Sequence, residues 1–175
     1  MSRAKAVTFK GNPVTLAGDA VQVGQKAPDF KCVSNAMAAV TLADSNGKAR
    51  LFSVVPSIDT PVCSTQTKKF EDAINALGDK VACYTISLDS PFAQKRFCGA
   101  EGVKTMQTLS DQHNQSFGKN WGVLFEESPL PINLLARSVF VVDPTGSVTY
   151  AEYVPEVTSE PNYTAAVEAL KKAAG

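Results

Sequence analysis

Residues 51–63 read LFSVVPSIDTPVC, and the two halves of this stretch predict different structures. The first five residues are almost all apolar, which predicts a strand buried on both faces, and Pro56 ends that strand. Thr60 is a good helix N-cap, and Pro61 stands at the first helical position, where proline is best tolerated. A buried strand therefore leads directly into a helix, and Cys63 lies in the first turn of that helix.

Elements of the same two kinds alternate along the rest of the chain. Apolar runs at 81–86 and 138–142 predict two further buried strands. Ser90-Pro91 repeats the cap-then-proline signal of a helix start. The remaining expected elements are a β-hairpin formed by 7–10 and 14–16 around Gly11-Asn12-Pro13, short strands at 108–109 and 147–150, a first helix that ends at Gly78, and helices at 91–98, 112–119 and 162–174.

This order of elements predicts an α/β architecture. We expect one domain over residues 1–175, with a central mixed β-sheet, helices on both faces of the sheet, and an N-terminal β-hairpin extension at 1–23. The periodicity does not by itself select one three-layer α/β fold among several.

Composition excludes several classes of protein. Of the 175 residues, 44% are apolar, which is enough for a core and argues against a disordered chain. Seventeen Lys and Arg residues balance seventeen Asp and Glu residues, so no basic excess favours nucleic acid or an anionic membrane as a partner. No apolar run approaches the roughly 20 residues of a membrane span, and the first residues lack the apolar segment of a signal peptide. We therefore expect a soluble, cytoplasmic protein.

Four cysteines and one histidine limit the possible chemistry. Cys32, Cys63, Cys83 and Cys98 form no C-x-x-C pair, which argues against a structural zinc site and against the usual dithiol oxidoreductases. Because His113 is the only histidine, any mechanism that needs two imidazoles is excluded. We interpret Cys32 and Cys83 as structural thiols in strand-like segments, and His113 as a surface residue on a polar helix.

Cys63 has the position of a reactive cysteine. In the first helical turn, backbone N–H groups lack partners and the helix dipole is positive, which favours a thiolate. Lowering the pKa of a thiol from about 8.5 to about 6 requires about 3.4 kcal/mol of stabilisation of the thiolate relative to the thiol. A helix N-terminus typically supplies about 0.3–1 kcal/mol. A nearby cation should therefore help to stabilise the thiolate. Lys68 and Lys69 face away from Cys63 around the helix, so Arg137, next to a very apolar strand, is the better candidate.

A structural interpretation of both residues is also open at this point. Cys63 shares one helical face with Phe70, Ile74 and Leu77, so it could be a small core residue, as most free cysteines are. An isolated arginine such as Arg137 more often lies at the surface or in an ion pair.

Four separated segments of the chain carry short motifs. Residues 56–63 read PSIDTPVC, residues 92–98 read FAQKRFC, residues 134–140 read LLARSVF, and residues 24–30 have the form G-x-x-A-P-x-F. The first segment matches the P-x-x-x-T-x-x-C signature of the peroxiredoxins. Together with the second segment it resembles, more narrowly, the bacterial thiol peroxidases, a peroxiredoxin subfamily of the atypical two-cysteine type. The other two segments resemble the usual peroxiredoxin entry and its arginine-bearing strand, so the similarity covers nearly the whole chain.

The resemblance implies a thioredoxin-like fold and the reduction of hydrogen peroxide and organic hydroperoxides by a thiol, without a metal or an organic cofactor. It implies that Cys63 is the peroxidatic cysteine, with Thr60 and Arg137 completing its site and Pro56 shielding it. It also implies that Cys98 is the resolving cysteine, which forms a disulfide with Cys63 within one subunit. Recycling by thioredoxin, a homodimeric state and a role in antioxidant defence are further implications of the family.

Two alternatives have different consequences. A redox-sensing binding protein would use the Cys63–Cys98 disulfide as a switch and would turn over poorly with thioredoxin. A thioredoxin-like module without redox chemistry would have an unreactive Cys63.

For the peroxidase, a disulfide requires Cα atoms within about 7 Å. Because Cys63 begins one helix and Cys98 ends another, we predict that both segments partly unwind in each cycle.

Overall fold

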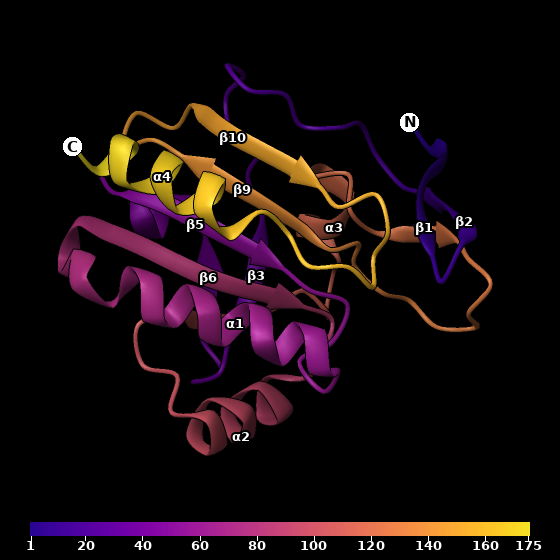
Figure 1. Cartoon of the computed structure of the whole chain (residues 1–175), viewed down its shortest axis with the longest axis horizontal. Coiled ribbons are helices and arrows are strands. Elements are labelled where there is room, and N and C mark those ends of the chain that lie inside the picture. The colour runs from indigo at the N-terminus through magenta and orange to yellow at the C-terminus, as the bar shows by residue number, and fades with distance from the viewer.

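A seven-stranded mixed β-sheet forms the centre of the molecule in the computed structural model, which describes residues 1–175 (Figure 1). Its strands are β3 (Lys31–Ser34), β4 (Ala39–Thr41), β5 (Ala49–Val54), β6 (Val81–Ser87), β7 (Gln107–Ser110), β9 (Ser138–Val142) and β10 (Val148–Tyr153), in the order β10-β9-β5-β6-β7-β3-β4. β5 pairs in parallel with β6, and β6 with β7, whereas β9 runs antiparallel to β5. The predicted mixed sheet is confirmed.

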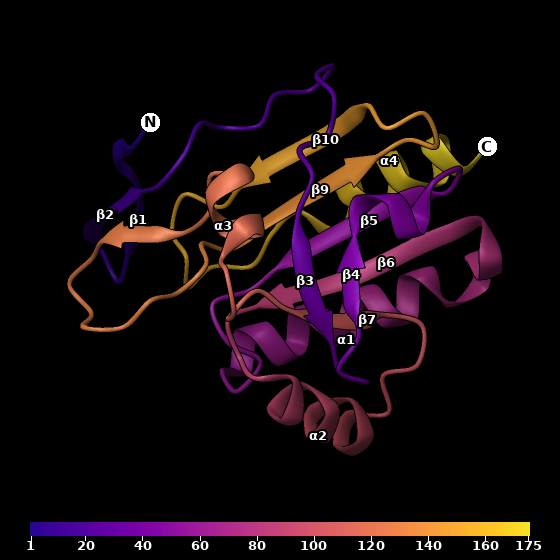
Figure 2. The same ribbon diagram turned by 180° about the vertical axis from the view of Figure 1, so that it is seen from behind.

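Helices lie on both faces of this sheet, as predicted. They are α1 (Pro61–Ile74), α2 (Pro91–Glu101), α3 (Ser116–Asn120) and α4 (Tyr163–Ala174), with short 3₁₀ helices at Leu42–Ser45 and Asn75–Lys80. α1 and α4 cover one face (Figure 1), whereas α3 lies on the opposite face (Figure 2). On the first face, Phe70 of α1 and Leu170 of α4 pack in one core with Leu51 of β5. None of the four helices is long and apolar enough to cross a membrane.

Aromatic side chains fill the opposite face of the sheet. Because side chains alternate along a strand, Phe52 points away from α1 and contacts Trp121, with ring centroids 5.1 Å apart. The Trp121 ring also stacks on Phe117 of α3 at 4.9 Å. Trp121 is completely buried and is a core residue.

The N-terminal hairpin is present and acquires a third strand. β1 (Arg3–Phe9) pairs with β2 (Asn12–Leu16), and β2 pairs with β8 (Phe125–Glu127) to form a separate small sheet, visible at the right of Figure 1. Val14 and Leu16 are fully buried in the core of the α3 face. The N–H of Thr8 donates to the carbonyl of Pro155 at 2.8 Å, which joins the hairpin to the loop after β10. The tip of the hairpin is thereby brought close to the main sheet.

Two helix ends differ from the sequence-based expectation. α1 ends at Ile74, before the 3₁₀ turn in which Gly78 has a positive φ of 58°. α2 continues past Gly99 to Glu101, because the left-handed conformation that closes the helix is adopted by Gly102, whose N–H donates to the carbonyl of Cys98. The predicted end at Cys98 is therefore wrong, and Cys98 lies in the last turn of the helix.

The helix predicted at 112–119 is shorter than expected. The carboxylate of Asp111 accepts hydrogen bonds from the N–H groups of Phe117 (3.0 Å) and Gly118 (2.7 Å), so the helix begins at Ser116. His113 therefore lies in the preceding turn. It is exposed, as predicted, but it is not on a helix.

Candidate active site

Cys63 lies in the first turn of α1, at the position predicted from the sequence. Thr60 is the N-cap, with an extended backbone (φ −94°), and Pro61 follows as the first helical residue. The sulfur is buried, because Cys63 is 0% exposed. The hydroxyl of Thr60 does not cap a helical N–H; it donates instead to the carbonyl of Ser57 at 3.2 Å. Its oxygen is therefore free to accept a hydrogen bond from a bound molecule.

Arg137 approaches Cys63 from the start of β9. Its guanidinium donates from Nη2 to Cys63 Sγ (3.3 Å) and from Nε to the carbonyl of Val157 (2.7 Å). Arg137 is 2% exposed, and none of the four ion pairs in the structure includes it. A buried guanidinium without a carboxylate partner favours negative charge on the sulfur that it contacts. The expected proximity of Arg137 and Cys63 is thus observed.

Gln66 is a residue of the site that the sequence interpretation missed. Its Oε1 accepts a hydrogen bond from Nη1 of Arg137 (2.9 Å), and its Nε2 donates to Ser53 Oγ of β5 (2.7 Å). Gln66 is completely buried. It fixes the guanidinium in the plane that points Nη2 at Cys63. A polar residue one helical turn after Cys63, on the buried face of the helix, was the available signal.

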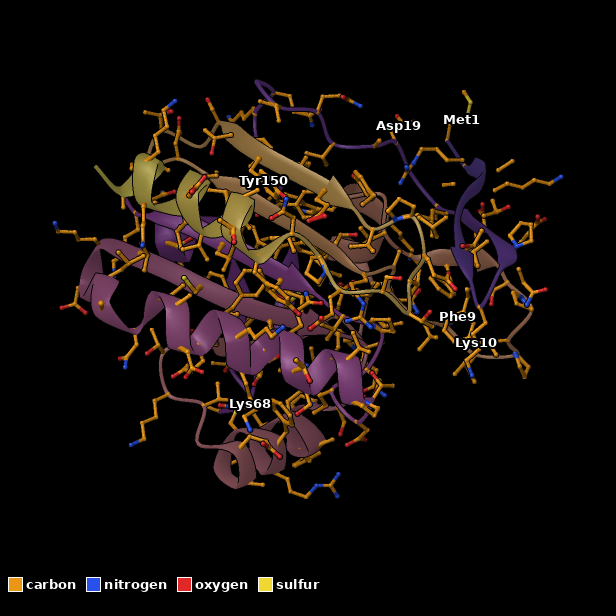
Figure 3. The ribbon with its side chains drawn as sticks, viewed as in Figure 1. Met1, Phe9, Lys10, Asp19, Lys68 and Tyr150 are labelled. Carbon is orange, nitrogen blue, oxygen red and sulfur yellow. The ribbon has the colours of Figure 1, made fainter.

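The two lysines of α1 take no part in the site, as expected. Lys68 points from α1 toward α2 (Figure 3) and pairs with Glu101 at 3.2 Å. Lys69 pairs with Glu160 at 3.1 Å. Both lysine side chains are about half exposed, so they stabilise the surface of the helix and leave Arg137 as the cation at the sulfur.

A pocket of about 310 Å³ opens beside this site. Pro56 lines this pocket together with Thr60 and Arg137. The proline that was expected to shield Cys63 therefore lies at the candidate site. Phe9 and Lys10, which Figure 3 labels at the N-terminal hairpin, also line the pocket. The remaining lining residues are Pro61, Val62, Val157 and Thr158. The walls are largely apolar, with cationic groups at Lys10 and Arg137.

Cys98 lies apart from this pocket, in the last turn of α2. Its sulfur is half-buried and lies 3.9 Å from Nδ2 of Asn35 and 3.7 Å from Oγ1 of Thr108. Burial raises the pKa of the Cys98 thiol, although the hydrogen bonds from Thr108 and Asn35 oppose the shift. All four cysteines are free thiols. The structure therefore brings Thr60 and Arg137 to Cys63, but it does not bring Cys98 to Cys63.

The other two cysteines are buried in the sheet. Burial raises the pKa of Cys83 to about 12. Burial, and to a smaller extent the carboxylate of Asp111, also raises the pKa of Cys32. Both are therefore neutral thiols at physiological pH and poor nucleophiles. No group of three or more His, Cys, Asp or Glu side chains is placed to hold a metal ion.

Comparisons with known proteins agree with a thiol chemistry. Residues 22–167 match the Redoxin family. The thiol peroxidase of Bacillus subtilis is 52% identical over 165 residues, covering 94% of this chain and 96% of the relative, and that of Listeria monocytogenes is 54% identical over 167 residues, covering 95% and 98%.

Solved structures extend this result to the fold. A peroxiredoxin-like protein from Aquifex aeolicus superposes with a TM-score of 0.89 at 38% identity, covering 97% of each chain. A thiol peroxidase from Chromobacterium violaceum has the same fold, with a TM-score of 0.84 at 20% identity over 95% of each chain. The thioredoxin-like fold implied by the sequence motifs is confirmed. With a buried cysteine at a helix N-terminus and relatives at this level of identity, the chain belongs to the thiol peroxidases, a family within the peroxiredoxins.

Proposed function

We propose that this protein is a thiol-dependent peroxidase that reduces hydrogen peroxide and alkyl hydroperoxides through Cys63. The observation that carries the proposal is the 3.3 Å contact between Arg137 Nη2 and Cys63 Sγ in a buried site beside an apolar pocket. A guanidinium in that place stabilises both the thiolate and the negative charge that moves onto the leaving oxygen. The apolar walls of the pocket suit an alkyl group on the peroxide.

The first chemical step takes place at Cys63. The thiolate attacks one peroxide oxygen, the O–O bond breaks, and the other oxygen leaves as hydroxide or alkoxide and is protonated to water or an alcohol. Cys63 becomes a sulfenic acid. Thr60 and Arg137 have the roles of orienting the peroxide, with the Thr60 oxygen accepting from the peroxide O–H and Arg137 donating to the oxygens.

The second step uses Cys98 as the resolving cysteine. Its thiolate attacks the sulfenic sulfur of Cys63, forming an intramolecular disulfide, and the hydroxyl group leaves as water. A dithiol reductant, for which we propose thioredoxin, then restores both thiols by exchange. We propose that the enzyme works as a homodimer in the cytoplasm and in antioxidant defence.

Peroxide consumption coupled to thioredoxin, thioredoxin reductase and NADPH tests this function. The wild type should turn over steadily, Cys63→Ser should be inactive, and Cys98→Ser should lose coupled turnover while still reacting once with peroxide. The matched control, Cys83→Ser, should retain most activity. A redox sensor would instead form the same disulfide and turn over poorly with thioredoxin. Loss of turnover in Cys83→Ser, with activity kept in Cys63→Ser, would refute the proposal.

A further inference from the structure

A carboxylate outside the site described above ties the loop in front of Cys63 to the sheet. Asp89 lies two residues after the end of β6 and is partly buried. Its Oδ1 accepts a hydrogen bond from Ser57 Oγ at 2.9 Å, and its Oδ2 accepts from the N–H of Ile58 at 2.9 Å and from Ser87 Oγ at 2.6 Å. No ion pair includes Asp89, so hydrogen bonds from neutral groups hold its carboxylate in place. Such charge-assisted hydrogen bonds are stronger than neutral ones.

The bonds from Asp89 fix the residues that lead into α1. The carbonyl of Ser57 accepts hydrogen bonds from both the N–H (3.3 Å) and the hydroxyl (3.2 Å) of Thr60, the N-cap of the helix. The carbonyl of Thr60 in turn accepts from the N–H of Ser64 at 3.0 Å. An unbroken series of hydrogen bonds therefore runs from Asp89 through Ser57 and Thr60 into the helical turn that contains Cys63.

The same carboxylate is connected to the helix that carries Cys98. Ser87 Oγ, which donates to Asp89, accepts a hydrogen bond from Nε2 of Gln94 at 3.0 Å. Gln94 is fully buried and stands four residues before Cys98 on α2, so the two lie on the same side of that helix. The parallel pairing of β5 and β6 explains this junction, because the loops that follow both strands emerge at one edge of the sheet.

We propose that Asp89 is a positioning residue that holds the Ser57–Thr60 loop closed and thereby sets the rate at which Cys98 reaches Cys63. The proposal rests on the proposed function. In the closed loop Cys63 is buried against Arg137, the arrangement that reacts with peroxide. Disulfide formation requires the loop to open, because the two sulfurs have separate partners in this structure.

Two reactions compete for the sulfenic acid on Cys63. Attack by the Cys98 thiolate forms the S–S bond and releases water, and it needs the open loop. Attack by the sulfenic acid on a second peroxide yields the sulfinic acid and one water or alcohol, and it proceeds in the closed site. Weakening the Asp89 contacts should therefore speed disulfide formation and reduce over-oxidation, with little effect on the first step. A general loss of folded structure would instead slow the first step, because that step needs Cys63 held against Arg137.

Asp89→Asn tests the proposal, because a neutral amide has one acceptor oxygen and cannot form the charge-assisted hydrogen bonds that the carboxylate accepts from Ser57, Ile58 and Ser87. Rapid quenching and mass spectrometry should show disulfide formation roughly tenfold faster than in the wild type, the factor expected for losing a charge-assisted hydrogen bond. The peroxide dose that converts half of Cys63 to sulfinic acid should rise by a similar factor. The rate constant of Cys63 with peroxide should change by less than about twofold.

Asp59→Asn is the matched control. Asp59 is an exposed carboxylate of the same loop that pairs with Arg96 of α2 at 3.7 Å, a surface contact that should contribute little. Ser57→Ala removes one bond to Asp89 and should accelerate disulfide formation by a smaller factor, roughly threefold. Disulfide formation that is unchanged or slower in both Asp89→Asn and Ser57→Ala would overturn the proposal. Failure of wild-type Cys63 to form sulfenic acid would instead overturn the proposed function.

Discussion

The buried arginine at the candidate site has one sulfur among its hydrogen-bond partners. Arg137 donates to the carbonyl of Val157, to the amide oxygen of Gln66 and to Cys63 Sγ. The first two acceptors are neutral oxygens, and the sulfur is the third group that the guanidinium contacts. The fork of the guanidinium also fixes the direction of each donated bond, which a lysine ammonium cannot do.

Arg137→Lys should therefore lower the rate constant of Cys63 with peroxide by roughly 10²-fold, although the positive charge is retained. Stopped-flow measurement of the first oxidation step checks this value. Arg96→Lys, at an arginine whose side chain is 75% exposed, is the control and should react like the wild type. A wild-type rate in Arg137→Lys would show that the directed contacts of the guanidinium do not assist the reaction.

At the scale of elements, the sequence predicts those parts of the site that depend on neighbouring residues alone. Thr60 and Pro61 mark the start of α1 within four residues of Cys63, so the position of the sulfur followed from neighbouring residues. Gln66 could not be assigned in the same way, because its partners, Ser53 and Arg137, lie 13 and 71 residues away. Only the pairing of strands in three dimensions defines that contact.

Helix ends show the same limit. Gly99 is a plausible stop for α2, yet the chain continues to Gly102, where the left-handed conformation forms. A glycine permits this conformation but does not require it, so the choice between two nearby glycines depends on packing. Asp111 likewise sets the start of α3 through contacts with its backbone that periodicity does not reveal.

The carboxylate of Glu71 joins α1 to the loop after α2. It accepts hydrogen bonds from the N–H groups of Lys104 (2.8 Å), Thr105 (2.7 Å) and Met106 (2.7 Å). Burial opposes its ionisation, but the bonds from Met106, Thr105 and Lys104 together outweigh burial and lower the pKa of Glu71. The ionised side chain thus stabilises the fold.

Glu71→Gln should reduce the free energy of unfolding at neutral pH by about 1 kcal/mol, since the group is partly exposed and solvent weakens the interaction. Because the pKa in the folded state lies below the ordinary 4.5, the contribution is complete above pH 4.5 and is lost as the pH falls through the folded-state value. Urea unfolding of both proteins between neutral and acidic pH measures the difference. A difference that grows on acidification would contradict this explanation.

At the scale of the whole molecule, the site is assembled from segments that are distant in sequence. The hairpin contributes Phe9 and Lys10 to the pocket, α1 contributes Cys63, and the start of β9 contributes Arg137. Cys98 stands on a different helix with its own partners. The proposed cycle, in which Cys98 joins Cys63 in a disulfide, therefore predicts a change in the structure of both helices, with the supporting sheet unchanged.

Hydrogen exchange followed by mass spectrometry tests this change. Amides at 57–66 and 95–101 should exchange faster in the disulfide form than in the reduced form, because both segments partly unwind to join the sulfurs. Amides of β5 and β9 in the centre of the sheet serve as the internal control and should keep their protection. Equal protection of both segments in the two redox forms would show that no unwinding is needed.

The most direct test of the central claim is to map the oxidised cysteines after one equivalent of hydrogen peroxide. The account predicts that peptide mass spectrometry of the wild type finds a Cys63–Cys98 disulfide, and that Cys98→Ser carries a sulfenic acid on Cys63, with Cys32 and Cys83 unmodified in both. Oxidation that begins at Cys32 or Cys83, or a Cys63 that stays reduced while peroxide is consumed, would contradict the account.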